Sequence, residues 1–136
     1  MRTTIILIMM LVSTSFVFAG EKKFQLSSHI LDIAQGKPVP NVSIRLSKMN
    51  NEKEWVTIDE KVTDSNGRIK DFLQEETGKN NQGIYKLTYY TKPYFDQLGV
   101  TSFYPFIEVV FALSDDSHYH VPITLSPFGY STYRGN

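Results

Sequence analysis

Three histidines are the side chains of this 136-residue sequence best suited to chemistry: His29, His118 and His120. A neutral imidazole has a pKa near 6.5, so it can accept a proton from water or bind a metal ion at ordinary pH. His118 and His120 are separated by one residue, which places both on the same face if the segment is a β-strand. The spacing indicates acid–base or metal chemistry on a strand surface.

Alternation of apolar and polar residues places all three histidines away from the expected core. Between residues 24 and 31, His29 shares one strand face with Gln25 and Ser27. Between residues 118 and 125, His118 and His120 share a face with Thr124. The opposite, mostly apolar faces carry Phe24, Leu26 and Ile30 in the first segment and Tyr119, Val121, Ile123 and Leu125 in the second. Solvent-exposed histidines without a chemical role are the alternative interpretation.

Arg68 and residues 126–136 are further candidates for a functional site. Arg68 begins an expected strand after the turn at residues 64–67, and taken alone it is typical of an ordinary surface arginine. The tail contains Tyr130 and Tyr133, whereas frayed chain ends are seldom aromatic. We therefore expect the tail to dock on its own domain or on a second subunit.

The elements that must position these residues are predicted to be β-strands. Residues 36–38 and 64–67 are turn signals, and the pair Asn66-Gly67 favours a hairpin. Residues 94–98 predict one short helix, and residues 104–113 are apolar on both faces, as in a central strand or one covered by another subunit. We expect an all-β sandwich of seven or eight strands with one short helix. The alternating apolar residues include Val42, Ile44, Leu46, Val56, Ile58, Val62, Tyr85, Leu87 and Tyr89.

The start and the composition of the chain bound its location and its partners. Arg2, an apolar stretch to Phe18 and a small residue at Ala19 form the pattern of a secretory signal peptide spanning residues 1–19. Residues 20–136 then form one soluble domain. Lys plus Arg and Asp plus Glu each total 14, and neither a nucleic-acid-binding basic face nor a membrane-binding stretch is evident. The absence of Cys excludes disulfides, thiolate nucleophiles and Cys-ligated zinc.

Residues 118–136, with the sequence HYHVPITLSPFGYSTYRGN, strongly resemble the C-terminal signature of the transthyretin-like 5-hydroxyisourate hydrolases, which end in Tyr-Arg-Gly-Ser. Residues 28–32 (SHILD), 63–68 (TDSNGR) and 102–105 (SFYP) match the family in the same order. The resemblance covers essentially the whole mature chain. Asn136 replaces the family's terminal serine, and although it can still form hydrogen bonds, a role specific to a serine hydroxyl is not carried over.

The resemblance implies a transthyretin-like, or prealbumin-like, β-sandwich that hydrolyses 5-hydroxyisourate to 2-oxo-4-hydroxy-4-carboxy-5-ureidoimidazoline in urate degradation. It implies a small-molecule substrate, no cofactor, no metal, and a homotetramer with sites between dimers. With the signal peptide, it suggests a periplasmic protein. The catalytic residues that it implies are His29, Arg68 and His120, with substrate contacts from Tyr133, Arg134, Gly135, Asn136 and, in a weaker supporting role, His118.

Two other functions compete with this hypothesis. The three histidines equal the ligand count of many catalytic zinc sites, which leaves a zinc hydrolase as an alternative. A transthyretin-like protein that binds a small ligand is the other, because a fold does not fix a function. Transthyretin lacks the histidines and the Tyr-Arg-Gly tail, so their presence here favours the hydrolase.

Overall fold

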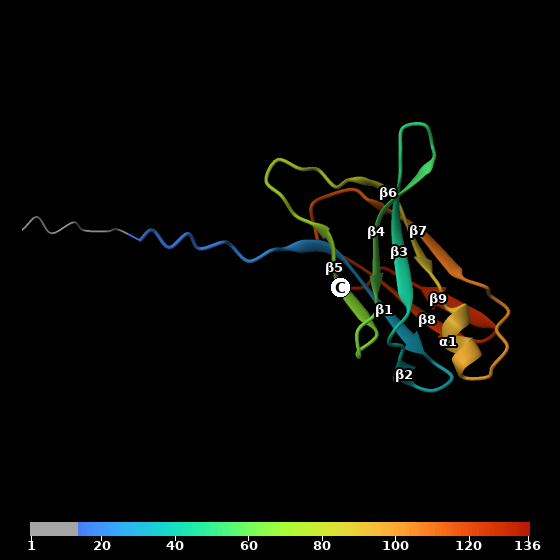
Figure 1. Ribbon diagram of the computed structural model, residues 1–136. Helices are drawn as coiled ribbons and strands as arrows, with labels where there is room; N and C mark the ends of the chain where they lie inside the picture. Colours follow the sequence, from blue (N-terminus) through green and yellow to red (C-terminus); the bar gives the residue numbers. More distant parts are fainter. Residues whose placement is uncertain (1–13) are drawn as a thin grey trace, which may run out of the picture.

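Two β-sheets pack face to face around one apolar core in this computed structural model, which describes residues 14–136 (Figure 1). Over these residues the chain forms nine strands and one short helix, so the predicted all-β sandwich is confirmed with a slightly higher strand count. The elements are β1 (Phe24–Asp32), β2 (Lys37–Pro38), β3 (Ser43–Met49), β4 (Trp55–Val62), β5 (Arg68–Gln74), β6 (Gly83–Tyr89), α1 (Lys92–Gln97), β7 (Ile107–Leu113), β8 (Tyr119–Ser126) and β9 (Gly129–Thr132).

One sheet contains a parallel strand pair, and that pair organises the rest of the sheet. Its strands run in the order β2-β1-β8-β9, and β5 also pairs with β1. The pairing of β1 with β8 is parallel, whereas β2, β5 and β9 join antiparallel. The other sheet, β4-β3-β6-β7, is antiparallel throughout. Parallel neighbours need a long crossover, which here is the chain from β2 to β7.

The core confirms most of the predicted alternation but not that of β4. Side chains such as Ile44 and Leu87 are fully buried, whereas Val56, Ile58 and Val62 are 47%, 45% and 58% exposed. Strand β4 lies at the edge of its sheet and pairs only with β3, with an irregular register beside Leu46. The register instead sets the polar residues Asp59 and Lys61 opposite buried β3 residues, and Lys61 Nζ lies 2.8 Å from Asp71 Oδ2 on β5.

Residues 64–67 form the predicted turn, but the predicted hairpin is wrong because β4 and β5 belong to different sheets. Gly67 has a φ of +70°, and its carbonyl accepts a hydrogen bond from the Ile30 amide. A Cβ atom at Gly67 would lie 2.7 Å from the Ile30 carbonyl oxygen and 2.8 Å from the Val39 nitrogen. The close approach requires glycine, and the turn carries the chain across the sandwich onto β1.

Helix α1 begins two residues earlier than the predicted segment, with Pro93 in its first turn, where a missing amide proton costs nothing. Phe95 is buried in the core, and the Tyr94 hydroxyl donates to Asp32 Oδ2 at 2.7 Å. Because the other oxygen of Asp32 accepts from the amides of Ala34 and Gln35, this carboxylate ties the end of β1 to the helix.

Strand β7 forms within the predicted segment 104–113 but starts at Ile107. The predicted central position is wrong, because β7 lies at the edge of its sheet: Ile107 and Val109 are buried, whereas Val110 on the other face is 57% exposed. Of the predicted signal peptide, residues 1–13 lie outside the described residues, and residues 14–19 form neither helix nor strand. Among the residues that the structure describes, no helix is long and apolar enough to cross a membrane.

Candidate active site

Residues from three neighbouring strands meet on the face of the β1–β8 sheet that points away from the core. Strand β1 contributes Ser27 and His29, β5 contributes Arg68, and β8 contributes His120. The strand order places β1 between β5 and β8. Residues Leu26 and Ile30 on the other face of β1 are fully buried, which confirms the predicted orientation of His29. The site therefore rests on a rigid, core-backed strand.

His29 and Arg68 are directly opposite each other in the antiparallel β1–β5 pair. The backbone of Arg68 is engaged elsewhere: its amide donates to Asp64 Oδ1 at 2.9 Å, and its carbonyl accepts from the Asp64 amide at 2.9 Å. His29 and Arg68 thus form the non-hydrogen-bonded type of pair, in which the side chains approach most closely. The turn at residues 64–67 therefore places the guanidinium group beside the imidazole.

His120 is aligned with Ser27 in the parallel β1–β8 pair, two residues along β1 from His29. The Ser27 hydroxyl oxygen lies 2.7 Å from His120 Nδ1 and 3.0 Å from His118 Nε2. Two residues along a strand span about 7 Å. His120, His29 and Arg68 consequently lie around one small patch of surface.

Buried hydrogen bonds hold this region from inside the sandwich. The Ser28 hydroxyl donates to the Val121 carbonyl at 2.8 Å and lies 2.9 Å from the Tyr89 hydroxyl of the opposite sheet. All three partners are buried. Satisfied polar groups in a low-dielectric core are costly to separate, so this cluster fixes the backbone that carries His29 and His120.

Electrostatics keep both central histidines in their neutral form. Burial lowers the pKa of His29, and the adjacent charge of Arg68 lowers it further. Burial also lowers the pKa of His120, followed by the charges of Arg68, His29 and His118. At neutral pH each ring therefore retains a nitrogen lone pair that can accept a proton.

The tail returns to this sheet, but its residues point in different directions. Gly135 forms a bridge to His120, and its amide donates to the His120 carbonyl at 2.8 Å. Gly135 lies against the imidazole so closely that a Cβ atom there would be 2.5 Å from His120 Cδ2. The Arg134 guanidinium instead stacks 4.2 Å from the ring centre of Tyr119, and its Nη2 atom donates to Ser117 Oγ at 3.1 Å.

The structure thus brings together only part of the predicted site. One region of the outer face contains five of the predicted residues: His29, Arg68, His118, His120 and Gly135. The side chain of Arg134 is held elsewhere, at Tyr119, which faces the core from β8. Tyr133 is 61% exposed and lines a separate apolar hollow with Val110 and Phe111 of β7, and Asn136 is exposed.

Ser27 was not singled out from the sequence. Its position two residues before His29, on the same strand face, was the available signal.

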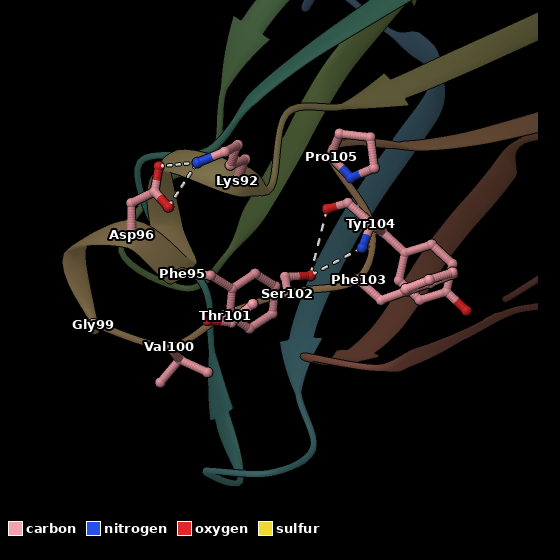
Figure 2. A pocket seen from close by; sticks show the side chains of 10 residues that line it. All are labelled: Lys92, Phe95, Asp96, Gly99, Val100, Thr101, Ser102, Phe103, Tyr104 and Pro105. Atoms are coloured by element: carbon pink, nitrogen blue, oxygen red, sulfur yellow. Dashed lines mark hydrogen bonds and ion pairs between the residues drawn. The ribbon is translucent and has the colours of Figure 1, made fainter.

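A hollow of about 400 Å³ lies elsewhere, between α1 and residues 99–105 (Figure 2). Its lining includes Phe95, Ser102 and Tyr104, and Ser102 Oγ donates to the Pro127 carbonyl at 3.0 Å. None of the three histidines and no arginine lines it. The histidine patch, with the half-buried His29 and His120, lies instead on the outer face of the β1–β8 sheet.

The histidine patch has the components for attack of water on a carbonyl group. A neutral imidazole can remove a proton from water. A permanently charged guanidinium can orient a carbonyl substrate and stabilise the negative oxygen that forms. Among residues 14–136, no group of three His, Cys, Asp or Glu side chains is arranged to hold a metal ion.

Comparison with known proteins finds relatives over nearly the whole domain. A model described as the HIUase/Transthyretin family matches residues 26–135. A probable 5-hydroxyisourate hydrolase of Caenorhabditis elegans is 45% identical over 112 residues, which cover 82% of this chain and 81% of that protein. The 5-hydroxyisourate hydrolase of Mus musculus is 37% identical over 113 residues, with coverage of 82% and 94%.

Solved structures with the same fold include both a hydrolase and a transthyretin with bound thyroxine. Klebsiella pneumoniae 5-hydroxyisourate hydrolase aligns with a TM-score of 0.69 and 33% identity, covering 86% of this chain and 100% of that one. Sea bream transthyretin, solved in complex with thyroxine, aligns with a TM-score of 0.74 and 31% identity, covering 82% and 94%. The backbone alone does not distinguish the two functions, so the side chains on it must.

Removing the charge of Arg68 should raise the pKa of both central histidines. In Arg68→Gln, His29 and His120 lose a neighbouring cation, so each ring should take up its proton at a higher pH than in the unchanged protein. NMR of the imidazole Cε1 protons between about pH 4 and pH 8 measures both titrations. Arg45→Gln is the matched control, because Arg45 pairs with Glu60 on the other sheet. Identical histidine titrations in both variants would contradict this coupling.

Proposed function

The chain belongs to the HIUase/transthyretin family, and we propose that it hydrolyses 5-hydroxyisourate, opening a ring of this intermediate of urate degradation. The observation that carries the proposal is the convergence of His29, Arg68 and His120 on the outer face of one sheet. Relatives named 5-hydroxyisourate hydrolase, among them the nematode and mouse proteins, support the same substrate.

The proposed reaction needs only water and the residues of this patch. A histidine removes a proton from water while the water oxygen bonds to the ring carbonyl carbon, and Arg68 faces the oxygen that becomes negative. The carbon–nitrogen bond of the ring then breaks, and the histidine returns its proton to the departing nitrogen. A positioned base contributes about 10²- to 10⁴-fold. An oxyanion donor contributes about 10²- to 10³-fold.

We assign the tail a supporting role at one wall of the site. Gly135 packs on the His120 ring, and the side chain of the preceding residue, Arg134, is anchored at Tyr119 and Ser117. Gly135 would therefore limit the movement of His120. Tyr133 and Asn136 are proposed to contact substrate only if a second subunit or the substrate itself draws them toward His29.

A direct assay separates this proposal from its alternatives. Ultraviolet absorbance should show freshly generated 5-hydroxyisourate decaying faster with the protein than without it, and kcat/KM should fall as pH drops through the lowered pKa of the base, below about 6.5. Substituting His29 or His120 with Asn, or Arg68 with Gln, should lower kcat/KM by about 10²-fold or more.

The controls of this assay address both competing functions. A ligand-binding protein similar to the thyroxine-bound transthyretin would leave the spontaneous decay unchanged. A zinc hydrolase would lose activity in chelator and regain it with added zinc. Wild-type rates in both histidine variants would refute the assignment of the site, whereas unchanged decay with the native protein would refute the proposed reaction.

Gly135→Ala tests the role of the tail. The new methyl group would overlap His120 Cδ2, so the tail or the ring must move, and we expect kcat/KM to fall by about 10-fold or more, since small displacements of reacting groups are costly. Gly129→Ala is the matched control, because its Cβ would meet only Ser126 Oγ, at 3.7 Å. Equal activities of the two variants would show that Gly135 does not position His120.

We also propose that the protein is exported to the periplasm and acts as a homotetramer. The signal-peptide pattern of residues 1–19 supports export, and exposed aromatic and apolar side chains such as Phe103 and Val110 support association. In a Gram-negative host, the periplasmic fraction should yield a chain beginning at Gly20 by mass spectrometry and four chains per particle by light scattering. A chain retaining its first residues, or an active monomer, would contradict the respective proposal.

A further inference from the structure

One hydroxyl group joins the two histidines of the His-Tyr-His segment. Ser27 Oγ lies 3.0 Å from His118 Nε2 and 2.7 Å from His120 Nδ1. The other ring nitrogen of His118, Nδ1, lies 3.0 Å from the Phe24 carbonyl oxygen. Four groups thus form one chain of hydrogen bonds that starts at the backbone of β1 and ends at His120.

The Phe24 carbonyl at the start of these hydrogen bonds determines which group donates and which accepts at each step. A carbonyl oxygen can only accept a hydrogen bond, so His118 Nδ1 must carry a proton. In neutral His118 the Nε2 atom is then bare and accepts from the Ser27 hydroxyl. Because that hydroxyl has one proton, its oxygen must accept from His120 Nδ1–H. Neutral His120 therefore has its lone pair on Nε2, the nitrogen that this chain of hydrogen bonds leaves free.

We propose that Ser27 and His118 are positioning residues that hold His120 in the tautomer with a basic Nε2, and that His120 Nε2 is the general base. The proposal rests on the hydrolase function above. The proton of the attacking water moves to Nε2 and returns from Nε2 to the departing ring nitrogen, so His120 ends the cycle neutral. His120 Nδ1–H donates to Ser27 throughout, because both nitrogens of a protonated imidazole are donors.

This arrangement gives the two central histidines different roles. His29 lies beside the fixed charge of Arg68, whereas the orientation and tautomer of His120 are set by the hydrogen bonds that Ser27 makes with both His120 and His118. Hydrogen-bond partners that orient metal-binding histidines typically contribute about 10- to 100-fold to activity, and we expect the same order for a histidine that acts as a base. Ser27 thus supports the reaction without contacting substrate.

Variants of the two positioning residues test the proposal. Ser27→Ala and His118→Phe should each lower kcat by about 10- to 100-fold with little change in KM. Ser27→Thr keeps the hydroxyl and should restore most of the rate. Ser43→Ala is the matched control, because it removes a serine that donates to Glu60 on the other sheet, and its kcat should be unchanged. An unaltered kcat in Ser27→Ala, or a Thr variant as slow as the Ala variant, would overturn the proposal.

A spectroscopic measurement separates this proposal from the identity of the substrate. Long-range ¹H–¹⁵N NMR spectra report which nitrogen of a neutral imidazole carries the proton. The native protein should show His120 protonated at Nδ1, and Ser27→Ala should show a mixture of tautomers. A native His120 protonated at Nε2 would overturn the proposed tautomer even if the protein hydrolyses 5-hydroxyisourate. Failure to hydrolyse that substrate, with the tautomer as expected, would refute the reaction but keep the positioning role.

Discussion

The parallel pairing of β1 with β8 is the constraint on which the site depends. Its register aligns Ser27 with His120 on the outer face, while the inner face is packed into the core. A shift of one residue would turn Leu26 or Val121 toward solvent, so burial of the inner face fixes the position of each outer residue. The apolar side of two strands thereby determines the geometry of a polar surface that it does not contact.

Antiparallel neighbours on either side complete the surface. Strand β5 joins β1 after a tight turn and brings Arg68 beside His29. Strand β9 extends the sheet beyond β8, and the chain after it continues alongside β8 in the same antiparallel register, which pairs Gly135 with His120. Both additions depend on glycine at a place where a side chain would collide: Gly67 beneath β1 and Gly135 against the imidazole. Backbone geometry thus positions both the Arg68 guanidinium group and the C-terminal residues that pack against His120.

Much of this arrangement could be predicted from strand parity, and the errors have definite physical causes. Alternation correctly placed the histidines outside the core because β1 and β8 are central strands with one fully buried face. It failed for Val56 and Ile58 because β4 is an edge strand whose register against β3 shifts beside Leu46, which breaks the simple alternation. The Asn66-Gly67 pair predicted the turn correctly but not the pairing of the strands on either side, since a turn sequence does not specify whether its flanking strands share a sheet.

The site was predictable to a lesser extent. Arg68 received a catalytic role only through the resemblance to a family, because which strands become neighbours depends on long-range pairing. The tail motif predicted proximity to the site correctly for Gly135, yet Arg134 stacks on Tyr119 because an aromatic ring at the sandwich edge offers a partner for its guanidinium. The role of Ser27 could not be predicted, because a serine on a strand indicates no function until its neighbours in space are known.

Ser27 and His120, which form a hydrogen bond, are 93 residues apart in the sequence, and this separation affects how the protein folds. Contacts of such high sequence separation form only after a large loop has closed, and folds dominated by them are slow to reach the native state. Until β8 docks, β1 lacks its central neighbour and presents an unsatisfied strand edge on which other chains could assemble. The docking of β8, which removes this strand edge, is therefore also the step that brings His29 and His120 together.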